Sequence, residues 1–248
     1  MRLKDKVILV TGARKGIGET VALALAKEGA DLALVSRSIR DDSDLVKEVK
    51  ALGRKVFVKR VDIGDRAQVF AMVDDILKEF GRIDVLFNNA GISRPVMLWN
   101  TTEEDWEDII RINLTGTFYC IQAVAKPMME QKSGSIINIT SAAGLVGTIG
   151  QVNYTAAKGG TYAMAKSAAK ELARYGIRVN TICPLAETDM TAKIAHDPKL
   201  SAKYLERIPL GRFAQPEEVS PAVIFFASDE SSIITGQTLC IDGGMVML

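Results

Sequence analysis

A tyrosine and a lysine stand four residues apart, at Tyr154 and Lys158, in an alanine-rich stretch with helical character. Residues at this spacing share one face of a helix. A phenol has a pKa of about 10, too high for ready proton exchange at neutral pH. A nearby ammonium stabilises the phenolate and lowers that pKa, so the pair is a candidate general acid/base. Because such pairs also occur by chance, further residues must support the prediction.

Ser141 provides that support, because it follows an apolar run at 135–139 that is typical of a buried strand. In an open parallel sheet, ligands bind outside the carboxyl ends of the strands. A hydroxyl at that position can hold a carbonyl oxygen while Tyr154 donates its proton. The three residues together predict proton transfer to or from a carbonyl or an alcohol.

A glycine-rich segment, TGARKGIG, occupies residues 11–18, between an apolar strand at 6–10 and a helical stretch at 16–28. Glycine lets the backbone turn sharply and approach a pyrophosphate closely. The following helix N-terminus offers free N–H groups and the positive end of its dipole. The segment therefore predicts a dinucleotide site, although its spacing is G-x-x-x-G-x-G rather than the common G-x-G-x-x-G.

The end of the second predicted strand, 31–35, indicates which dinucleotide is preferred. An NAD enzyme usually carries an acid about 20 residues beyond the glycines, where it holds the ribose 2′-hydroxyl. Here Ser36 and Arg37 stand at that place, no acid lies between the end of this strand and Asp41, and the glycine turn contains Arg14 and Lys15. Because a 2′-phosphate binds cations and Arg offers bidentate bonds, we predict NADP(H) rather than NAD(H).

The elements that must position these residues alternate along the chain. Strands are predicted at 6–10, 31–35, 55–61, 83–87, 135–139, 178–183 and 237–241, and helices at 16–28, 44–52, 65–80, 103–129, 153–174 and 216–228. The helix over 103–129 is expected to end near Pro127, and residues 184–213 to be less regular. This order predicts an α/β fold: a Rossmann-type, doubly wound parallel sheet of about seven strands with helices on both faces. We expect a single domain over residues 1–248, with a substrate lid at about 188–213.

Composition limits the class of protein. The chain has 248 residues, 48% hydrophobic and 25% charged, which is ordinary for a globular chain with a sizeable core. Its 31 basic and 30 acidic residues give no global drive toward nucleic acid or a membrane surface. No run approaches the roughly 18 apolar residues of a membrane span. Three separated cysteines and a single histidine, Cys120, Cys183, Cys240 and His196, predict reduced core thiols, no metal site and a cytoplasmic protein.

The chain resembles the short-chain dehydrogenase/reductase family from about Lys4 to Gly244. The matching pieces, in order, are the glycine turn, the segment NNAG at 88–91, Asn113, Ser141, and Tyr154 with Lys158. Within the family it is most similar to the 3-oxoacyl-[acyl-carrier-protein] reductase branch, because of the stretches PLGR at 209–212 and 236–245.

The resemblance implies a role for each matching residue. Tyr154 is the general acid/base, Lys158 lowers its pKa and binds the nicotinamide ribose, Ser141 orients the substrate oxygen, and Asn113 holds a water that relays protons. Relatives usually form tetramers through the two long helices and the C-terminal tail. With the residues of the turn and of the strand end, the expected cofactor contacts are Gly12, Arg14, Lys15, Gly16, Ile17, Gly18, Ser36, Arg37, Asp62 (at the adenine), Ile63, Asn89, Ala90, Gly91, Tyr154, Lys158, Pro184 and Thr188.

One stretch departs from the family pattern. After the sixth strand, relatives usually show Pro-Gly and then a Thr five residues past the Pro. Here the sequence PLAET at 184–188 lacks the glycine and brings Thr188 only four residues past Pro184. In relatives this stretch contacts the nicotinamide carboxamide, so the departure concerns the position of the nicotinamide.

We therefore predict reversible hydride transfer between NADPH and a carbonyl or secondary alcohol in a homotetramer. The substrate is a small molecule or a carrier-bound 3-oxoacyl thioester. One alternative is a sugar, polyol or small-alcohol dehydrogenase of the same family. A second is a non-catalytic NADP(H)-binding regulatory subunit, against which the intact Ser141, Tyr154 and Lys158 argue. A third is an epimerase or dehydratase, which usually needs a larger C-terminal region than follows Ile182.

Overall fold

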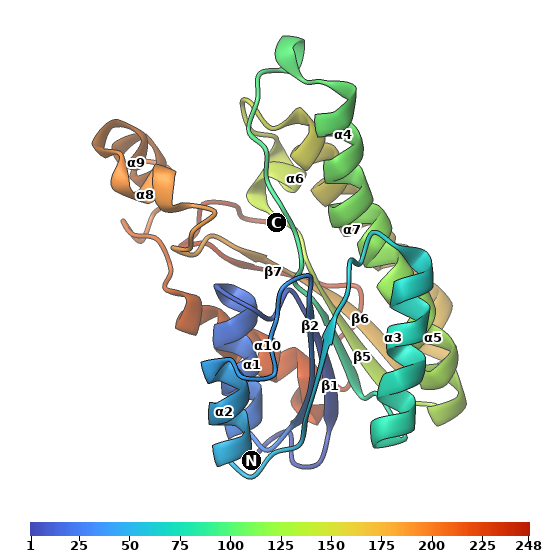
Figure 1. The fold of residues 1–248 in the computed structure, drawn as a ribbon. Coiled ribbons are helices and arrows are strands. Elements are labelled where there is room, and N and C mark those ends of the chain that lie inside the picture. Colours follow the sequence, from blue (N-terminus) through green and yellow to red (C-terminus); the bar gives the residue numbers. More distant parts are fainter.

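Seven strands form one sheet in the computed structural model, which describes the backbone of residues 1–248 and the side chains of residues 1–192 and 194–248. The strand order is β3-β2-β1-β4-β5-β6-β7, and every neighbouring pair is parallel (Figure 1). The chain therefore reverses its direction of winding at β1, as the predicted doubly wound fold requires. The strands are β1 (Val7–Thr11), β2 (Asp31–Ser36), β3 (Val56–Arg60), β4 (Val85–Asn88), β5 (Gly134–Ile139), β6 (Ile177–Pro184) and β7 (Thr238–Ile241).

Alternate residues of each strand face two separate apolar cores. Ile8 and Val10 of β1 belong to one core, and Val7 and Leu9 belong to the other. Because both faces are covered by helices, the inner strands are continuous apolar runs. Figure 1 shows the two groups of helices on opposite sides of the sheet. The first group is α1 (Ile17–Lys27), α2 (Asp44–Ala51) and α10 (Ser220–Ala227); the second is α3 (Arg66–Phe80), α5 (Gly116–Gln131) and α7 (Val152–Leu172).

The helix predicted over 103–129 is three segments in the structure. α4 (Glu103–Ile110) passes into a π-helical segment (Arg111–Thr115), which continues directly into α5. The prediction that this helix ends near Pro127 was wrong, because α5 continues to Gln131 with Pro127 inside it. Met128 is fully buried on the turn beyond the proline, so packing of that turn outweighs the local preference of proline to end a helix.

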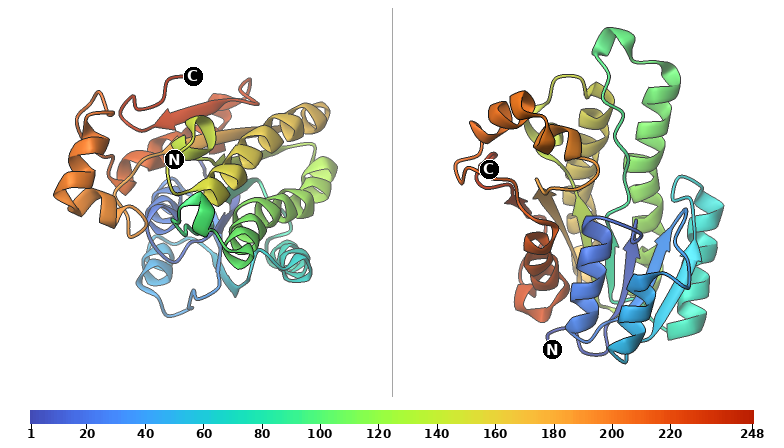
Figure 2. Two further views of the ribbon diagram at one scale, coloured as in Figure 1. Left: turned by 90° about the horizontal axis from the view of Figure 1, so that it is seen from above. Right: turned by 60° about the vertical axis from the view of Figure 1, so that its left-hand side comes forward.

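Three short helices were not predicted. α6 (Ala142–Val146) follows β5, while α8 (Ala192–His196) and α9 (Pro198–Leu205) lie in the segment expected to be irregular. Figure 2 shows α8 and α9 as an arm that stands off the body of the molecule. Helices as short as the five residues of α6 and α8 carry too little periodic pattern to be distinguished from loops. Four 3-10 segments complete the chain, at Leu98–Asn100, Ala173–Tyr175, Pro216–Val219 and Asp229–Ser231.

Among the helices of the described part of the chain, none is both long enough and apolar enough to cross a membrane.

Candidate active site

Ser141 lies where the sequence predicted it, just beyond the carboxyl end of β5. It is the N-cap of α6, and its hydroxyl oxygen accepts a hydrogen bond from the backbone N–H of Ala143 at 3.3 Å. The cap fixes the hydroxyl at the edge of the sheet where the other strands also end. α7 begins at Val152 and brings Tyr154 to the same edge.

The ammonium group of Lys158 is held in one place by the end of β5. Lys158 is buried, and its Nζ donates a hydrogen bond to the carbonyl of Ile139 at 2.8 Å. The hydroxyl of Thr140 donates to the main-chain carbonyl of Lys158, also at 2.8 Å. The ammonium nitrogen is 5.8 Å from the centre of the Tyr154 ring. The predicted pair is therefore a real spatial pair, anchored to the strand that leads to Ser141.

Burial changes the proton affinity of both members of this pair. It raises the pKa of Tyr154 to about 12, a shift that a hydrogen bond with the Ser141 hydroxyl opposes. Burial lowers the pKa of Lys158 to about 8. Of the neighbouring groups, only Ser141 lowers the pKa of Tyr154, so the lowering expected from Lys158 stays a prediction. At neutral pH Tyr154 holds its proton and can act as a donor.

Asn113 lies in the π-helical segment and is fully buried. Its side-chain amide donates to the carbonyl of Ile92 at 3.0 Å and accepts from the N–H of Ile92 at 3.1 Å. A Cβ on Gly91 would lie 2.6 Å from Oδ1 of Asn113 and 3.8 Å from Nζ of Lys158. Only glycine therefore lets the loop after β4 fit between these two side chains. A π-helical turn in a helix is frequent at functional sites.

The main-chain carbonyl of Asn113 accepts hydrogen bonds from the hydroxyls of Thr117 at 2.9 Å and Thr161 at 3.3 Å. Both polar atoms of its side chain are occupied by Ile92. In this structure Asn113 positions the loop after β4 and joins it to α7, and its expected part in a proton relay stays a prediction.

The glycine turn brings backbone close to backbone, as a pyrophosphate site requires. Gly12 has φ of 67°, and a Cβ there would lie 2.8 Å from Cα of Ala90. A Cβ on Gly18 would collide with the carbonyl of Gly12. The side-chain amide of Asn89 donates to the carbonyls of Thr11 at 2.9 Å and Gly12 at 3.1 Å. Asn89 and Ala90 therefore fasten the turn to the end of β4.

The first turn of α1 faces this glycine turn without a side-chain cap. Gly16 is its N-cap and contributes no hydrogen-bonding side chain. The first N–H groups of the helix, beginning at Ile17, are thus available to an anion and lie at the positive end of the helix dipole. Thr188 lies close by, with its Cγ2 3.7 Å from where a Cβ on Gly16 would be. A turn that a Cβ would fill and an uncapped helix fit the pyrophosphate of a dinucleotide.

Basic and hydroxyl groups gather at the end of β2. Arg14 donates from Nη1 to Oγ of Ser38 at 3.1 Å, and the N–H of Ser38 donates to Oγ of Ser36 at 3.3 Å. Arg37 is exposed beside them. Within the part of the chain whose side chains are described, neither arginine forms an ion pair with a carboxylate. The guanidinium of Arg14 is therefore held by Ser38 just beyond the carboxyl end of β2.

The stretch that departs from the family pattern pairs with the far end of the expected lid. Pro184 ends β6, after which Leu185 accepts from the N–H of Ala214 at 3.1 Å and Glu187 donates to the carbonyl of Ala214 at 2.8 Å. These bonds close the base of the segment 188–213. Its first residues reach the glycine turn, where Lys15 pairs with Asp189 at 2.7 Å.

Asp62 and Ile63 follow β3 at the same edge of the sheet. The Asp62 carboxylate accepts from the N–H of Gly64 at 2.9 Å and pairs with Arg111 at 3.0 Å. Ile63 is buried, and its carbonyl would lie 2.9 Å from a Cβ on Gly116. These bonds hold the loop after β3 against the π-helical segment, and the adenine contact of Asp62 stays a prediction.

Sequence reasoning missed three residues that contact or lie near Tyr154 and Lys158. Thr140 holds the main chain of Lys158, and a Cβ on Gly144 would lie 2.6 Å from the carbonyl carbon of Lys158, so α6 packs directly on α7. Cys183, on β6, is near enough that its ionised thiol would raise the pKa of both Tyr154 and Lys158. None of these leaves a signal in the sequence, because each acts through backbone contact or strand register.

Known proteins match this chain over its whole length. A sequence profile of the family described as Enoyl-(Acyl carrier protein) reductase matches residues 12–246. The 3-oxoacyl-[acyl-carrier-protein] reductase FabG of Thermotoga maritima is 46% identical over 248 residues, which covers 100% of both chains. The protein of the same name from Staphylococcus aureus is 43% identical over 244 residues, 98% of each chain. The crystal structure of levodione reductase superposes with a TM-score of 0.90 at 35% identity, covering 98% of each chain. As its motifs indicated, the chain belongs to the short-chain dehydrogenase/reductase family and is an oxidoreductase.

Proposed function

We propose that this protein uses NADPH to reduce the 3-oxo group of acyl thioesters carried on an acyl carrier protein. The observation that carries the proposal is the convergence of Ser141, Tyr154 and Lys158 at one edge of the sheet, beside the glycine turn. The substrate class is supported by the names of the relatives, which at 43–46% identity are 3-oxoacyl-[acyl-carrier-protein] reductases.

Ser141 and Tyr154 act on the carbonyl oxygen of the substrate. The chemistry that NADPH supplies when bound is a hydride for the carbonyl carbon, and Gly12, Gly16 and the first turn of α1 would hold its pyrophosphate. As negative charge develops on the oxygen, Ser141 donates a hydrogen bond and Tyr154 donates its proton. Because the pKa of Tyr154 is raised to about 12, the phenol is fully protonated at neutral pH and ready for the reductive direction.

Lys158 stabilises the phenolate that remains after this transfer. An ammonium 5.8 Å from the ring centre is worth about 3 kcal/mol at an effective dielectric constant of about 20. The bond from Lys158 to the Ile139 carbonyl keeps the charge in place during the cycle.

Arg14 and Arg37 support the choice of NADPH over NADH. A 2′-phosphate at the end of β2 would meet the guanidinium that is already bonded to Ser38, with the exposed Arg37 alongside. Charge-assisted bonds of this kind contribute about 1.5–3 kcal/mol each. A ribose 2′-hydroxyl would find no carboxylate in the same place among the side chains described.

The test is a steady-state assay that follows nicotinamide absorbance with a panel of substrates: a 3-oxoacyl thioester on acyl carrier protein, small ketones, and sugar or polyol substrates, each with NADPH and with NADH. We expect the carrier-bound thioester with NADPH to give the highest kcat/KM. Tyr154→Phe should lower kcat by about 10²–10⁴-fold while the Kd for NADPH changes little.

Each other outcome has a distinct meaning. Full reductase activity in Tyr154→Phe would refute the catalytic assignment, and a tenfold or greater preference for NADH would refute the cofactor. A higher kcat/KM for a sugar, polyol or small alcohol would assign the protein to that branch of the family. Tight NADPH binding without turnover of any substrate would identify a regulatory subunit.

A further inference from the structure

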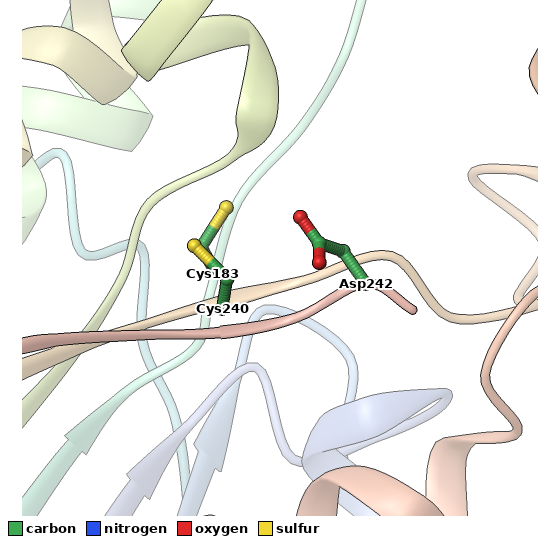
Figure 3. A group of neighbouring side chains, drawn as sticks. All are labelled: Cys183, Cys240 and Asp242. Atoms are coloured by element: carbon green, nitrogen blue, oxygen red, sulfur yellow. The ribbon is translucent and has the colours of Figure 1, made fainter. Parts of the chain in front are cut away.

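Two of the three cysteines are direct neighbours in the sheet. Cys183 on β6 and Cys240 on β7 are partners in the parallel register. Register partners on adjacent strands point to the same face, so their thiols lie together. Asp242 follows two residues after Cys240, and Figure 3 shows its carboxylate directed toward the two sulfurs. The two Sγ atoms and a carboxylate oxygen all lie within 4.8 Å of one another.

We propose that Cys183, Cys240 and Asp242 form a site for one thiophilic divalent cation of the Zn²⁺ class, with a fourth coordination position left open. Two sulfurs and one carboxylate oxygen are a donor set that zinc takes, whereas Mg²⁺ and Ca²⁺ require oxygen ligands alone. Tetrahedral bonds of 2.0–2.3 Å place ligand atoms about 3.3–3.8 Å apart. The ligand atoms of the observed cluster lie within 4.8 Å of one another, at most about 1 Å beyond those separations. The sequence, in which the two cysteines are far apart, predicted no such site.

The Asp242 carboxylate is oriented and lacks a cationic partner. It is 3% exposed, and its two oxygens accept the N–H groups of Gly244 at 3.1 Å and Val246 at 3.0 Å. Among the side chains that the structure describes, no lysine, arginine or histidine forms a salt bridge with it. A buried charge is costly unless it is paired or coordinates a metal, so a cation would complete this site. The two backbone bonds would act as supports that fix the ligand oxygen.

Cys183 and Cys240 are both free thiols. A divalent cation displaces one proton from each thiol and forms two metal–sulfur bonds. Two positive charges enter and two protons leave, so the net charge of the site is unchanged. Cys240 is half-buried, which leaves a route from solvent.

A bound ion would have a structural effect. It would join the edge strand β7 to β6 and to the turn that begins at Asp242, close to Lys158, which lies within electrostatic range of Cys183. A ligand that binds only the folded state raises the melting temperature. The inference concerns side chains outside the proton-transfer group, so it does not rest on the proposed substrate.

The test uses untagged full-length protein, reduced with a phosphine and freed of metal by a chelator, and titrated with Cd²⁺ as the probe. We expect a sulfur-to-cadmium charge-transfer band that saturates at one ion per chain, a rise in melting temperature, and release of about two protons per ion at neutral pH. Zn²⁺ should compete with Cd²⁺ and remove the band, and excess Mg²⁺ should not.

Variants assign the band to the cluster. Cys183→Ser and Cys240→Ser should each abolish it, and Asp242→Asn should weaken binding at least tenfold. Cys120→Ser, which changes the buried thiol of α5, is the matched control and should keep the full band. His196→Ala tests the exposed His196–Glu187 pair as an accidental site and should also keep it. Circular dichroism of the metal-free variants verifies folding. Absence of a band in the parent protein, or an equal band in the well-folded Cys240→Ser variant, would overturn the proposal.

Discussion

At the scale of single residues, Lys158 is held in a position that disfavours its own charge. Burial lowers its pKa from 10.5 to about 8, which corresponds to about 3 kcal/mol in favour of the neutral form. Because the folded-state pKa is the lower one, this penalty on folding is full below pH 8 and disappears as the pH rises past the ordinary lysine value. The penalty arises because the positive charge of Lys158 is buried next to Tyr154.

Lys158→Met should separate the two effects. We expect kcat/KM to fall by about 10²–10⁴-fold, because the phenolate of Tyr154 loses its stabilising charge. The melting temperature at pH 7 should change by only a few degrees. Loss of the charge removes about 3 kcal/mol of desolvation, while the unpaired Ile139 carbonyl costs about 1–3 kcal/mol. Thermal melts and steady-state kinetics at pH 7 measure both, and a variant with parental activity would exclude the assigned role.

The same lysine should set the pH dependence of the reduction. With a pKa lowered to about 8, Lys158 loses its charge as the pH rises through 8, whereas Tyr154, with its pKa raised to about 12, keeps its proton. We therefore expect kcat to fall above pH 8 with loss of a single proton. The residual activity of Lys158→Met should be flat between about pH 7 and pH 9. A parental profile that is flat through pH 9 would show that the charge of Lys158 does not matter for kcat.

Arg37 is the residue on which the cofactor preference can be measured. Arg37→Ala should raise the KM for NADPH by about 10–100-fold and leave the KM for NADH nearly unchanged, since only NADPH carries the 2′-phosphate. Arg40→Ala is the matched control in the same loop, because Arg40 is already paired with Asp42 at 2.7 Å. Equal effects of Arg37→Ala on both cofactors would show that Arg37 does not recognise the phosphate.

At the scale of elements, the contact of α6 with α7 positions Ser141 relative to Tyr154. Gly144→Ala places a Cβ 2.6 Å from the carbonyl carbon of Lys158, a backbone atom that cannot move aside. We expect a loss of about 1–3 kcal/mol of stability and a lower kcat, because the two helices must separate. Gly159→Ala is the milder change on the other side of the contact, where a Cβ would lie 3.2 Å from the Gly144 carbonyl oxygen, so it should cost less stability than Gly144→Ala. Chemical denaturation and steady-state kinetics would compare the two variants. A Gly144→Ala variant that is as stable as the Gly159→Ala variant would contradict this account.

The regular elements were largely predictable from the sequence. The seven strands fall within two residues of the predicted bounds, because each is a short apolar run with turn residues on either side. The π-helical segment that carries Asn113 was not predictable, since its register depends on packing against α7 and the loop after β4. The last turn of α5 beyond Pro127 depends on packing in the same way.

The candidate site was predictable to a similar degree. Spacing indicated Tyr154, Lys158 and the glycine turn, because helix periodicity and strand ends can be read from one sequence. It could not indicate the Ile139 carbonyl that holds the ammonium, nor the pairing of Cys183 with Cys240. Contacts through the backbone and between parallel strands depend on register, which no local pattern records.

At the scale of the whole molecule, exposed apolar residues lie on the C-terminal tail, where the family resemblance places a subunit contact, and on the loop before β7. Ile233 is 94% exposed, and Met247 and Leu248 at the C-terminus are 80% and 73% exposed. Such residues next to an edge strand are typical of a surface that is covered in an assembly. Sedimentation should show a species four times the 26.9 kDa of one chain. A monomer at micromolar concentration would contradict the homotetramer that we propose.

The strands of the sheet are all parallel, so everything described for the site lies at one end of the molecule. The loops at the opposite end lead into the amino ends of the strands. Two of them contain Gly53 and Gly81, where a Cβ would meet no atom within 4 Å. A short peptide tag inserted in either loop would therefore point away from substrate and cofactor. An enzyme immobilised on a solid support through either loop should keep its turnover, because the attachment lies at the opposite end of the sheet from the site.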